Sequence, residues 1–342
     1  MAGLVINSSF KMVSSQLAFG IGKSVLLIGK SSKAVPLQRA SVLSESLASV
    51  GAESNLGRMI EAAMLQRCKT VYFIGLGTAI PSDKPYKKAL IEGSKEGAYF
   101  AVVDDASEAI LPEIKEYLDF CFANAIRGVV LAGGGTKEVE KANHYRIWIT
   151  EDNLADRGGN PLPACVSAAA LAGALTNESD LSLPFGGIVV RGYTLKEFKH
   201  LDSIRTTTEA GVLCFQQVGT DLQVYQGTTS YVDPAPNEDA LKDPEVVCTV
   251  DEVVQTVEKV IFSKHNRTKI SRLPDIKDTV YTVLSDTFAK QEKIYPPDAE
   301  RIVAVPDPEK RGKANLRYHF NVVPGLKELE VSVTGEVTAQ NS

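Results

Sequence analysis

Short apolar runs alternate with amphipathic segments along the first half of the chain, and this alternation is the strongest constraint on its fold. Segments 24–28 and 70–74 are continuous apolar runs, as expected of strands covered on both faces. Between them, 56–66 repeats apolar residues at helical spacing. The rhythm continues with extended segments at 98–103, 128–131 and 144–150 and helices at 86–93, 107–125 and 137–142. Strands separated by helices predict parallel β-α-β units.

The second half of the chain divides at a proline-rich acidic linker, 233–239. Before it, 164–175 predicts a helix of small residues, and 186–231 returns to strand character. After it, Thr249 and Glu252 have capping-box spacing and open one helix, and a second helix is predicted over 275–290. Strands are then predicted at 301–305, 315–323 and 329–338.

These patterns predict an α/β fold class with four parts. The main part is a core with a mainly parallel sheet flanked by helices, followed by a smaller α+β carboxy-terminal domain. Extended β-arms form the two ends. The predicted boundaries are an amino-terminal arm at 1–22, the α/β core at 23–232, the carboxy-terminal domain at 233–326 and a carboxy-terminal arm at 327–342.

Both ends of the chain carry a short strand pattern with no evident partner. Segment 329–338 alternates apolar and polar residues after a stop at Pro324-Gly325. An apolar segment near the amino terminus is joined to the first core strand by Ser14-Ser15-Gln16. A strand without a partner in its own domain pairs with another chain, which favours a building block over a solitary enzyme. The predicted inter-subunit strand residues are Leu4, Val5, Ile6, Leu329, Val331, Val333 and Val337.

Charge and composition exclude several function classes. The formal net charge is -5, whereas proteins that bind nucleic acid concentrate an excess of Lys and Arg. No apolar run approaches the roughly 20 residues that cross a bilayer, so direct membrane insertion is not expected. The five Cys and four His are dispersed without metal-ligand spacing, which predicts free thiols in a reducing cytoplasm and neither a metal nor a cofactor.

Four motifs suggest enzyme chemistry, and each departs from the catalytic pattern. Segment 19–24 contains Gly-Lys-Ser but lacks the first glycine of a phosphate-binding loop and precedes a strand. The turn Gly75-Leu76-Gly77 is followed by a proline-flanked segment instead of the helix of a dinucleotide site. The triple glycine at 133–135 is interpreted as a connector, and Asp104-Asp105 as a solvated strand end and helix cap. No catalytic residue is predicted.

Cations gather in the carboxy-terminal part of this acidic chain. The residues are Lys259, Lys264, Arg267, Lys269, Arg272 and Lys277, opposed only by Asp275. Such a group is either a solvated helix end or a docking face for an acidic protein partner.

The order of these features resembles the contractile tail sheath family of myophages, R-type bacteriocins and related injection machines. Each motif is weak alone, and the resemblance rests on their order along most of the chain. Gln226 stands where the family often has Arg, which is a departure. The motifs lie at 35–37, 51–63, 164–175, 208–212, 226–231 and 250–262.

The resemblance implies a sheath-like core and a mechanical function without catalysis or cofactor. Many copies would assemble helically around an inner tube protein through exchanged terminal arms, together with baseplate and tail terminator proteins. The chain would be made in the bacterial cytoplasm and become part of a phage tail or tail-like particle. The basic residues Lys259, Lys264, Arg267, Lys269 and Arg272 would then face the tube. Two alternatives remain: an α/β nucleotide-binding enzyme, or another phage-like structural assembly protein.

Overall fold

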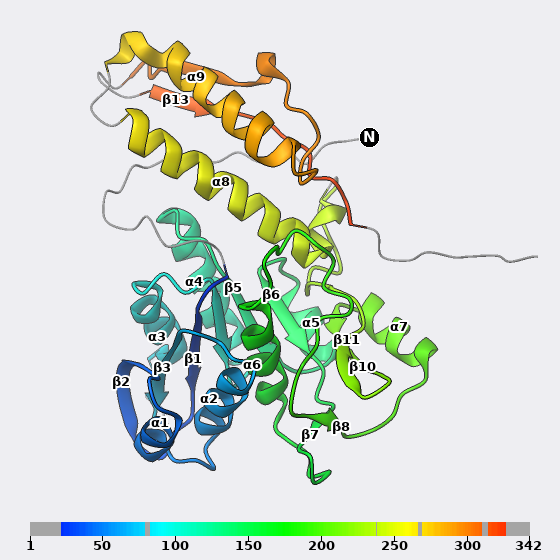
Figure 1. The fold of residues 1–342 in the computed structure, drawn as a ribbon. Helices are drawn as coiled ribbons and strands as arrows, with labels where there is room; N and C mark the ends of the chain where they lie inside the picture. The colour runs from blue at the N-terminus through cyan, green and yellow to red at the C-terminus, as the bar shows by residue number, and fades with distance from the viewer. Residues whose placement is uncertain (1–21, 79–82, 237, 266–268, 310–313, 326–342) are drawn as a thin grey trace, which may run out of the picture.

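The computed structural model describes residues 22–78, 83–236, 238–265, 269–309 and 314–325. Its centre is a seven-stranded sheet in the order β2-β3-β1-β4-β5-β6-β9 (Figure 1). All neighbouring strands pair in parallel except β2, which pairs antiparallel with β3 at one edge. The predicted α/β class with a mainly parallel sheet is therefore confirmed. The strands are β1 (Val25–Gly29), β2 (Ala34–Arg39), β3 (Val71–Leu76), β4 (Phe100–Val103), β5 (Val129–Gly133), β6 (Ile147–Thr150) and β9 (Val212–Leu213).

Helices cover both faces of this sheet, so the core has three layers. Along β1, Val25 and Leu27 belong to one hydrophobic cluster, and the intervening Leu26 and Ile28 belong to the other. This alternation is the two-residue period of a strand, and it explains why the run is apolar at every position. The first cluster is covered by α2 (Asn55–Leu65) and α6 (Ala164–Leu175), and the second by α3 (Pro85–Ser94), α4 (Leu111–Ala123) and α5 (Thr136–Ala142).

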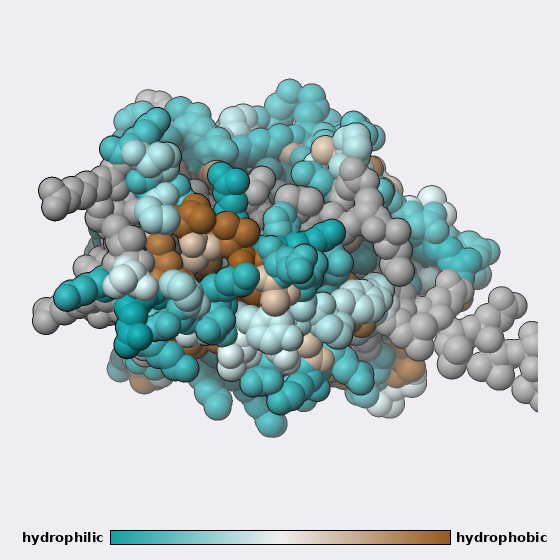
Figure 2. Space-filling model, turned by 90° about the horizontal axis from the view of Figure 1, so that it is seen from above, coloured by the Kyte–Doolittle hydropathy of each residue, from teal (hydrophilic) through white to brown (hydrophobic). Residues whose placement is uncertain are grey.

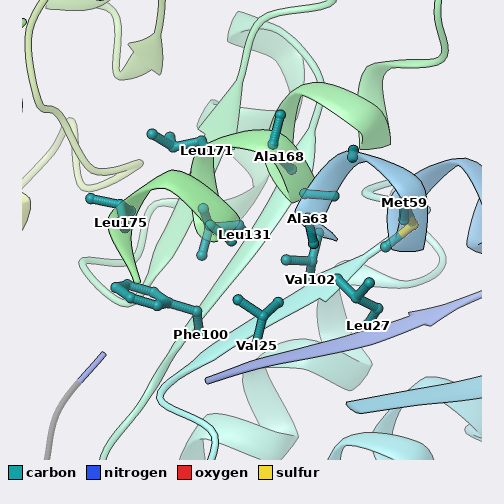
Figure 3. Close-up of a cluster of buried hydrophobic side chains, with 14 of the residues drawn as sticks. Val25, Leu27, Met59, Ala63, Phe100, Val102, Leu131, Ala168, Leu171 and Leu175 are labelled. Atoms are coloured by element: carbon teal, nitrogen blue, oxygen red, sulfur yellow. The ribbon is translucent and has the colours of Figure 1, made fainter. Parts of the chain in front are cut away.

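The small-residue helix α6 lies at the centre of the first cluster. Figure 3 shows Ala168 and Leu171 of α6 among side chains from α2 and the sheet, including Ala63 and Leu131. Every α6 residue from Cys165 to Leu175 is buried. Small side chains allow this close approach because larger ones would push the neighbouring helix away. The sequence prediction of a closely packed helix is confirmed.

Three elements of the core were not predicted. Helix α1 (Leu43–Val50) and strand β2 lie between β1 and α2, where the sequence analysis assigned no element. Pro36 is compatible with β2 because this strand is at the sheet edge, where a missing N–H costs no ladder bond. Helix α7 (Leu201–Glu209) lies inside 186–231, so the strand character predicted there is wrong over this stretch.

Helix α7 accommodates its threonines because their hydroxyls bond within the helix and one face of the helix is buried. Thr206 and Thr207 each donate to the carbonyl four residues earlier, at 2.9 and 2.8 Å. Ile204 and Thr208, four residues apart, are both buried. Tertiary packing of this face overrides the local strand preference of threonine. The remaining strands of this part are β7 (Leu154–Ala155), β8 (Thr194–Leu195), β10 (Phe215–Val218) and β11 (Asp221–Val224).

A third hydrophobic cluster lies in the carboxy-terminal part, which we call the C-terminal unit (residues 244–323). It contains α8 (Pro244–His265), η2 (Ile270–Arg272), α9 (Leu273–Thr282), the π-helical segment η3 (Val283–Ala289), η4 (Ala299–Arg301), β12 (Val303–Pro306) and β13 (Ala314–Arg317). It is joined to the core through η1 (Asp239–Lys242). The four-part domain boundaries stay a prediction, because α8 contributes residues to the core cluster as well as to the third cluster.

A buried ion pair holds α8 against the core. Arg146 donates from both terminal nitrogens to the two carboxylate oxygens of Asp251, at 2.6 and 2.7 Å. Tyr99 donates its hydroxyl to the same carboxylate at 2.9 Å, and Arg146 also donates to the Gly128 carbonyl at 3.1 Å. Asp251 is only 1% exposed. Two donors, Tyr99 before β4 and Arg146 before β6, therefore converge on one residue of α8, and the Gly128 carbonyl before β5 holds the Arg146 guanidinium.

The surroundings of this joint shift the pKa values of Arg146 and Tyr99 upward. Burial alone would lower the pKa of Arg146, but the Asp251 carboxylate more than compensates and the net shift is upward. Burial, followed by the Asp251 charge, raises the pKa of Tyr99. A second ion pair joins Arg127 Nη2 to Glu258 Oε1 at 3.2 Å. Since Glu258 follows Asp251 by seven residues, both lie on the same face of α8.

We predict that Gly133→Ala destabilises the protein, because an added Cβ would lie 2.1 Å from the carbonyl carbon of Ala164 at the start of α6. Overpacking of this kind costs about 1–3 kcal/mol, and backbone atoms cannot give way as side chains do. Gly135→Ala is the control, since its Cβ would meet only Glu138 Oε2 at 3.7 Å. Urea denaturation should show a loss of at least about 2 kcal/mol for the first variant and less than about 1 kcal/mol for the second. Equal losses would contradict this packing.

We also predict that Asp251→Ala lowers the free energy of unfolding by about 3–5 kcal/mol, because it leaves the Arg146 guanidinium buried without its partner. The double variant Arg146→Met/Asp251→Leu should recover most of this loss. Glu108→Ala is the control, since it removes the exposed pair between Lys141 and Glu108, with side chains 50% and 75% exposed, worth about 0–1 kcal/mol. Denaturation curves measure all three. A loss below about 1 kcal/mol for Asp251→Ala would show that the joint is dispensable.

Candidate assembly surfaces

Strands β12 and β13 form a separate antiparallel sheet in the C-terminal unit. They pair from Val303 with Arg317 to Pro306 with Ala314. Among the described residues, this sheet has two strands only, so the outer edge of each strand has no strand partner there. A two-stranded sheet is marginally stable by itself, and its open edges are templates for further strands.

One face of this sheet is apolar and exposed. The inner face packs on the unit's cluster through Leu316, which lies opposite Ala304, and the preceding Ile302 is 0% exposed. Val303 and Val305 are 42% and 46% exposed, as expected for the opposite face of a strand. Viewed from above, apolar side chains gather within a largely hydrophilic surface (Figure 2). These two valines are not among the predicted inter-subunit residues. Their spacing of two, which places both on one face of a strand, is the sequence signal that could have identified them.

The predicted inter-subunit strand residues lie outside the described residues. They are Leu4, Val5, Ile6, Leu329, Val331, Val333 and Val337. Their pairing therefore stays a prediction. The described chain begins at Gly22 and ends at Gly325.

The residues of the predicted basic face do not all lie on one side of α8. At about 100° per residue, Lys259 lies on the side opposite the buried stripe of Val250, Val257 and Ile261, whereas Lys264 lies close to that stripe at the helix end. Lys259, Lys264, Lys269 and Arg272 are exposed, and Arg267 lies outside the described residues.

The cations after Lys259 lie at the connection between α8 and α9. Lys269 precedes η2, and Arg272 ends it. Arg272 pairs with Asp275 at 3.1 Å. A cationic end of the C-terminal unit is thus formed by Lys264, Lys269 and Arg272, while Lys259 belongs to another side.

The motif at 226–231 has a structural role at the joint. Thr229 donates its amide to the Lys242 carbonyl at 2.8 Å and its hydroxyl to the Leu241 carbonyl at 2.9 Å. Ser230 donates its amide to Ile147 and its hydroxyl to His144, each at 3.0 Å. The two small hydroxyl residues therefore connect η1, which leads into α8, to the start of β6.

The carboxylates of Asp104 and Asp105, which follow β4, have structural roles. Asp104 accepts hydrogen bonds from Tyr86 Oη at 2.7 Å, Asn55 Nδ2 at 2.9 Å and the Lys30 amide at 2.9 Å. The interpretation of Asp104 as solvated is therefore wrong, because three elements converge on it. Asp105 accepts from the Ser107 amide at 2.8 Å and so caps a turn; the predicted helix cap is wrong, because the helix starts later, at Leu111.

The glycine motifs form turns and close contacts. Gly77 donates its amide to Ser31 Oγ at 3.0 Å, which fixes the turn after β3. Gly133 packs directly on the start of α6, so that helix occupies the carboxyl end of β5. In the part of the chain that the structure covers, no three His, Cys, Asp or Glu side chains gather as metal ligands, and no described helix is long and apolar enough to cross a membrane.

Comparison with known proteins finds the same fold in solved structures but no match by sequence. No protein-family model matches the chain, and no curated protein matches its sequence. A chain of the anti-feeding prophage baseplate has a TM-score of 0.72 at 11% identity, with 98% of this chain and 100% of that chain covered. The anti-feeding prophage helical sheath in its contracted state has a TM-score of 0.69 at 11% identity, with coverage of 97% and 100%.

A bacterial relative gives the same result. The sheath tail protein from Desulfitobacterium hafniense has a TM-score of 0.67 at 12% identity, with 94% of this chain and 100% of that chain covered. At such low identity the likeness establishes the fold. The resemblance read from the sequence motifs is confirmed at this level: the chain has the fold of contractile tail sheath proteins.

Proposed function

We propose that this chain is a structural subunit of a contractile tail sheath, which polymerises helically around an inner tube and contracts to drive that tube through a cell envelope. The observation that carries the proposal is the fold shared with two sheath structures over 94% and 97% of the chain. The sheet of β12 and β13 supports it, because in the described part of the chain no further strand pairs with its edges, where strands from other copies could add.

Assembly proceeds by strand exchange in this proposal. The segments containing Leu4–Ile6 and 329–338 are the donor strands, and the outer edges of β12 and β13 are the acceptors. Backbone ladders need little side-chain complementarity, so they keep neighbouring copies linked while the bodies change orientation. Exposed Val303 and Val305 supply the apolar face that an enlarged sheet would bury.

Contraction is a rigid-body rearrangement of these linked subunits. The bidentate contact of Arg146 with Asp251 fixes α8 to the core, so bending is confined to arm linkers such as Ser14-Ser15-Gln16. A few hundred Å² of additional apolar burial per subunit, at about 25 cal/mol per Å², contributes several kcal/mol. Summed over many copies, this burial supplies the work of contraction without a cofactor or a catalytic step.

The partners follow from this role. They are further copies of the chain, the inner tube protein, and baseplate and tail terminator proteins. The likeness to a chain from the anti-feeding prophage baseplate structure supports contact with a baseplate. The subunit is made in the bacterial cytoplasm and incorporated into a phage tail or tail-like particle.

The direct test is negative-stain microscopy of the purified protein. A sheath subunit forms hollow tubes with helical striation, whereas an α/β enzyme stays dispersed and a different assembly protein forms another shape. A saturable melting shift on titration with millimolar nucleotide, without tubes, would favour the enzyme alternative instead.

We predict that removing the donor strand or blocking the acceptor sheet prevents tube formation while the monomer stays folded. Deletion of 329–342 removes the carboxy-terminal strand, and Val305→Lys places a charge on the exposed face of β12. Microscopy should show no tubes for either variant. Thermal melting of the monomer should change by only a few degrees, because Val305 is already 46% exposed.

Each variant has a matched control. Deletion of only 339–342 removes the polar tail and keeps the predicted strand. Val218→Lys changes an equally exposed valine, 47% exposed, on the hairpin of β10 and β11 in the core. Both controls should assemble normally. Ordered tubes from the 329–342 deletion would contradict strand exchange.

We also propose that the cationic end of the C-terminal unit faces the tube. Lys264→Glu/Lys269→Glu should reduce co-sedimentation with purified inner tubes of the same particle by at least about fivefold, because like charges then oppose an acidic tube surface. Lys33→Glu/Lys137→Glu, which changes two exposed lysines of the core, is the charge-matched control. Equal binding by the two double variants would exclude this docking face.

A further inference from the structure

The loop that follows α6, residues 177–184, touches the place where the described chain begins. Gly22 is buried with a φ of +79°, and a Cβ on it would lie 2.5 Å from Leu181 Cδ1. The next residue, Lys23, donates from Nζ to the Glu178 carbonyl at 3.0 Å. The first described residues, Gly22 and Lys23, therefore lie against this loop.

The same loop touches the place where the described chain ends. A Cβ on Gly325 would lie 2.4 Å from Pro184 Cγ. Lys293, which is 8% exposed, pairs with Asp180 of the loop at 3.0 Å and with Glu252 of α8 at 2.9 Å. The Lys293 carbonyl accepts the Val323 amide at 3.0 Å. The last described residue, Gly325, thus also lies against the loop.

Internal hydrogen bonds give the loop a fixed shape. Asp180 Oδ1 accepts from the amide of Ser182 at 2.9 Å and from its hydroxyl at 2.6 Å. Asn177 Nδ2 donates to the Gln66 carbonyl at 2.6 Å, which ties the start of the loop to the end of α2. Burial raises the pKa of Asp180, but Ser182 and Lys293 outweigh it and hold this carboxyl below its usual range.

We infer that residues 177–184, the anchor loop, are a common anchor for both terminal segments and couple the contacts made by one segment to those made by the other. Leu181 and Pro184 are three residues apart, which is at most about 11 Å of chain. A force that moves one terminal segment therefore also moves the loop residues that contact the other segment. The coupling rests on the proposed function, since it assigns the two segments to inter-subunit contacts.

Lys293 offers a matched pair of variants, because its two carboxylate partners lie at nearly equal distances. Asp180→Asn removes the ion pair that reaches the anchor loop. Glu252→Gln removes the ion pair that stays within the C-terminal unit. The Asp180 and Glu252 side chains are 31% and 38% exposed, so the two changes are similar in burial.

Hydrogen exchange of the full-length monomer tests the anchor without assembly. In Asp180→Asn, the Val25 amide near the start and the Val323 amide near the end should both exchange at least about fivefold faster, while amides of β5 are unchanged. In Glu252→Gln, the Val25 amide should exchange as in the unmodified chain. Acceleration at one end only in Asp180→Asn would overturn the common anchor.

Leu181→Ala tests the same coupling by changing the contact at the amino-terminal side of the loop. This variant replaces Asp180→Asn in the test if Asp180→Asn fails to fold. This change removes the contact with Gly22, yet it should also accelerate the Val323 amide by about fivefold. An effect confined to Val25 would overturn the inference.

Tube formation then separates this inference from the proposed function. If the unmodified chain forms no tubes, the proposed function is wrong, and exchange still decides whether the loop anchors both ends. If it forms tubes and Asp180→Asn yields markedly fewer than Glu252→Gln, the coupling is supported. Tubes in equal amount from both variants would overturn the coupling.

Discussion

The attachment of α8 to the core is the constraint on which the rest of the structure depends. This single helix of 22 residues contributes Val247 and Cys248 to the core cluster and Val253, Val257 and Ile261 to the cluster of the C-terminal unit. A continuous helix curves only gently unless it is kinked, so it holds the two clusters in a nearly fixed arrangement. The position of the C-terminal unit is therefore set by how the first half of α8 sits on the core.

The buried pair of Arg146 and Asp251 specifies that position. Such a pair adds little net stability compared with apolar residues of similar size, because both charges lose their hydration. Its effect is directional, because two parallel hydrogen bonds from the guanidinium require one orientation of the carboxylate. The bond from Tyr99 and the bond to the Gly128 carbonyl fix the pair further. A packed apolar contact would allow α8 to slide, whereas this network does not.

The molecule treats its sheet edges in two different ways. In the core, β2 carries Pro36 and an irregular register between Val35 and Gln38, and β9 at the other edge has two residues. Both features discourage pairing with another chain. In the C-terminal unit, β12 presents Val303 and Val305 outward. Among the described residues, the exposed apolar strand face therefore lies in the C-terminal unit, in which we propose that copies exchange strands.

The sequence by itself determined every strand of the central sheet except β2, together with α2, α6 and the absence of a catalytic pattern, because burial on two faces leaves a continuous apolar run and helix packing leaves a fixed spacing. It did not determine α7, because the strand propensity of threonine says nothing of the packing that overrides it. It also did not determine the three hydrogen bonds at Asp104, because a single carboxylate in a sequence does not indicate its partners. Only the tertiary structure showed that α8 belongs to two clusters and that Gly22 and Gly325, the first and last described residues, both lie against residues 177–184. These facts depend on contacts between residues more than 100 positions apart, such as Arg146 with Asp251 and Lys293 with Asp180, and no local pattern records such distances.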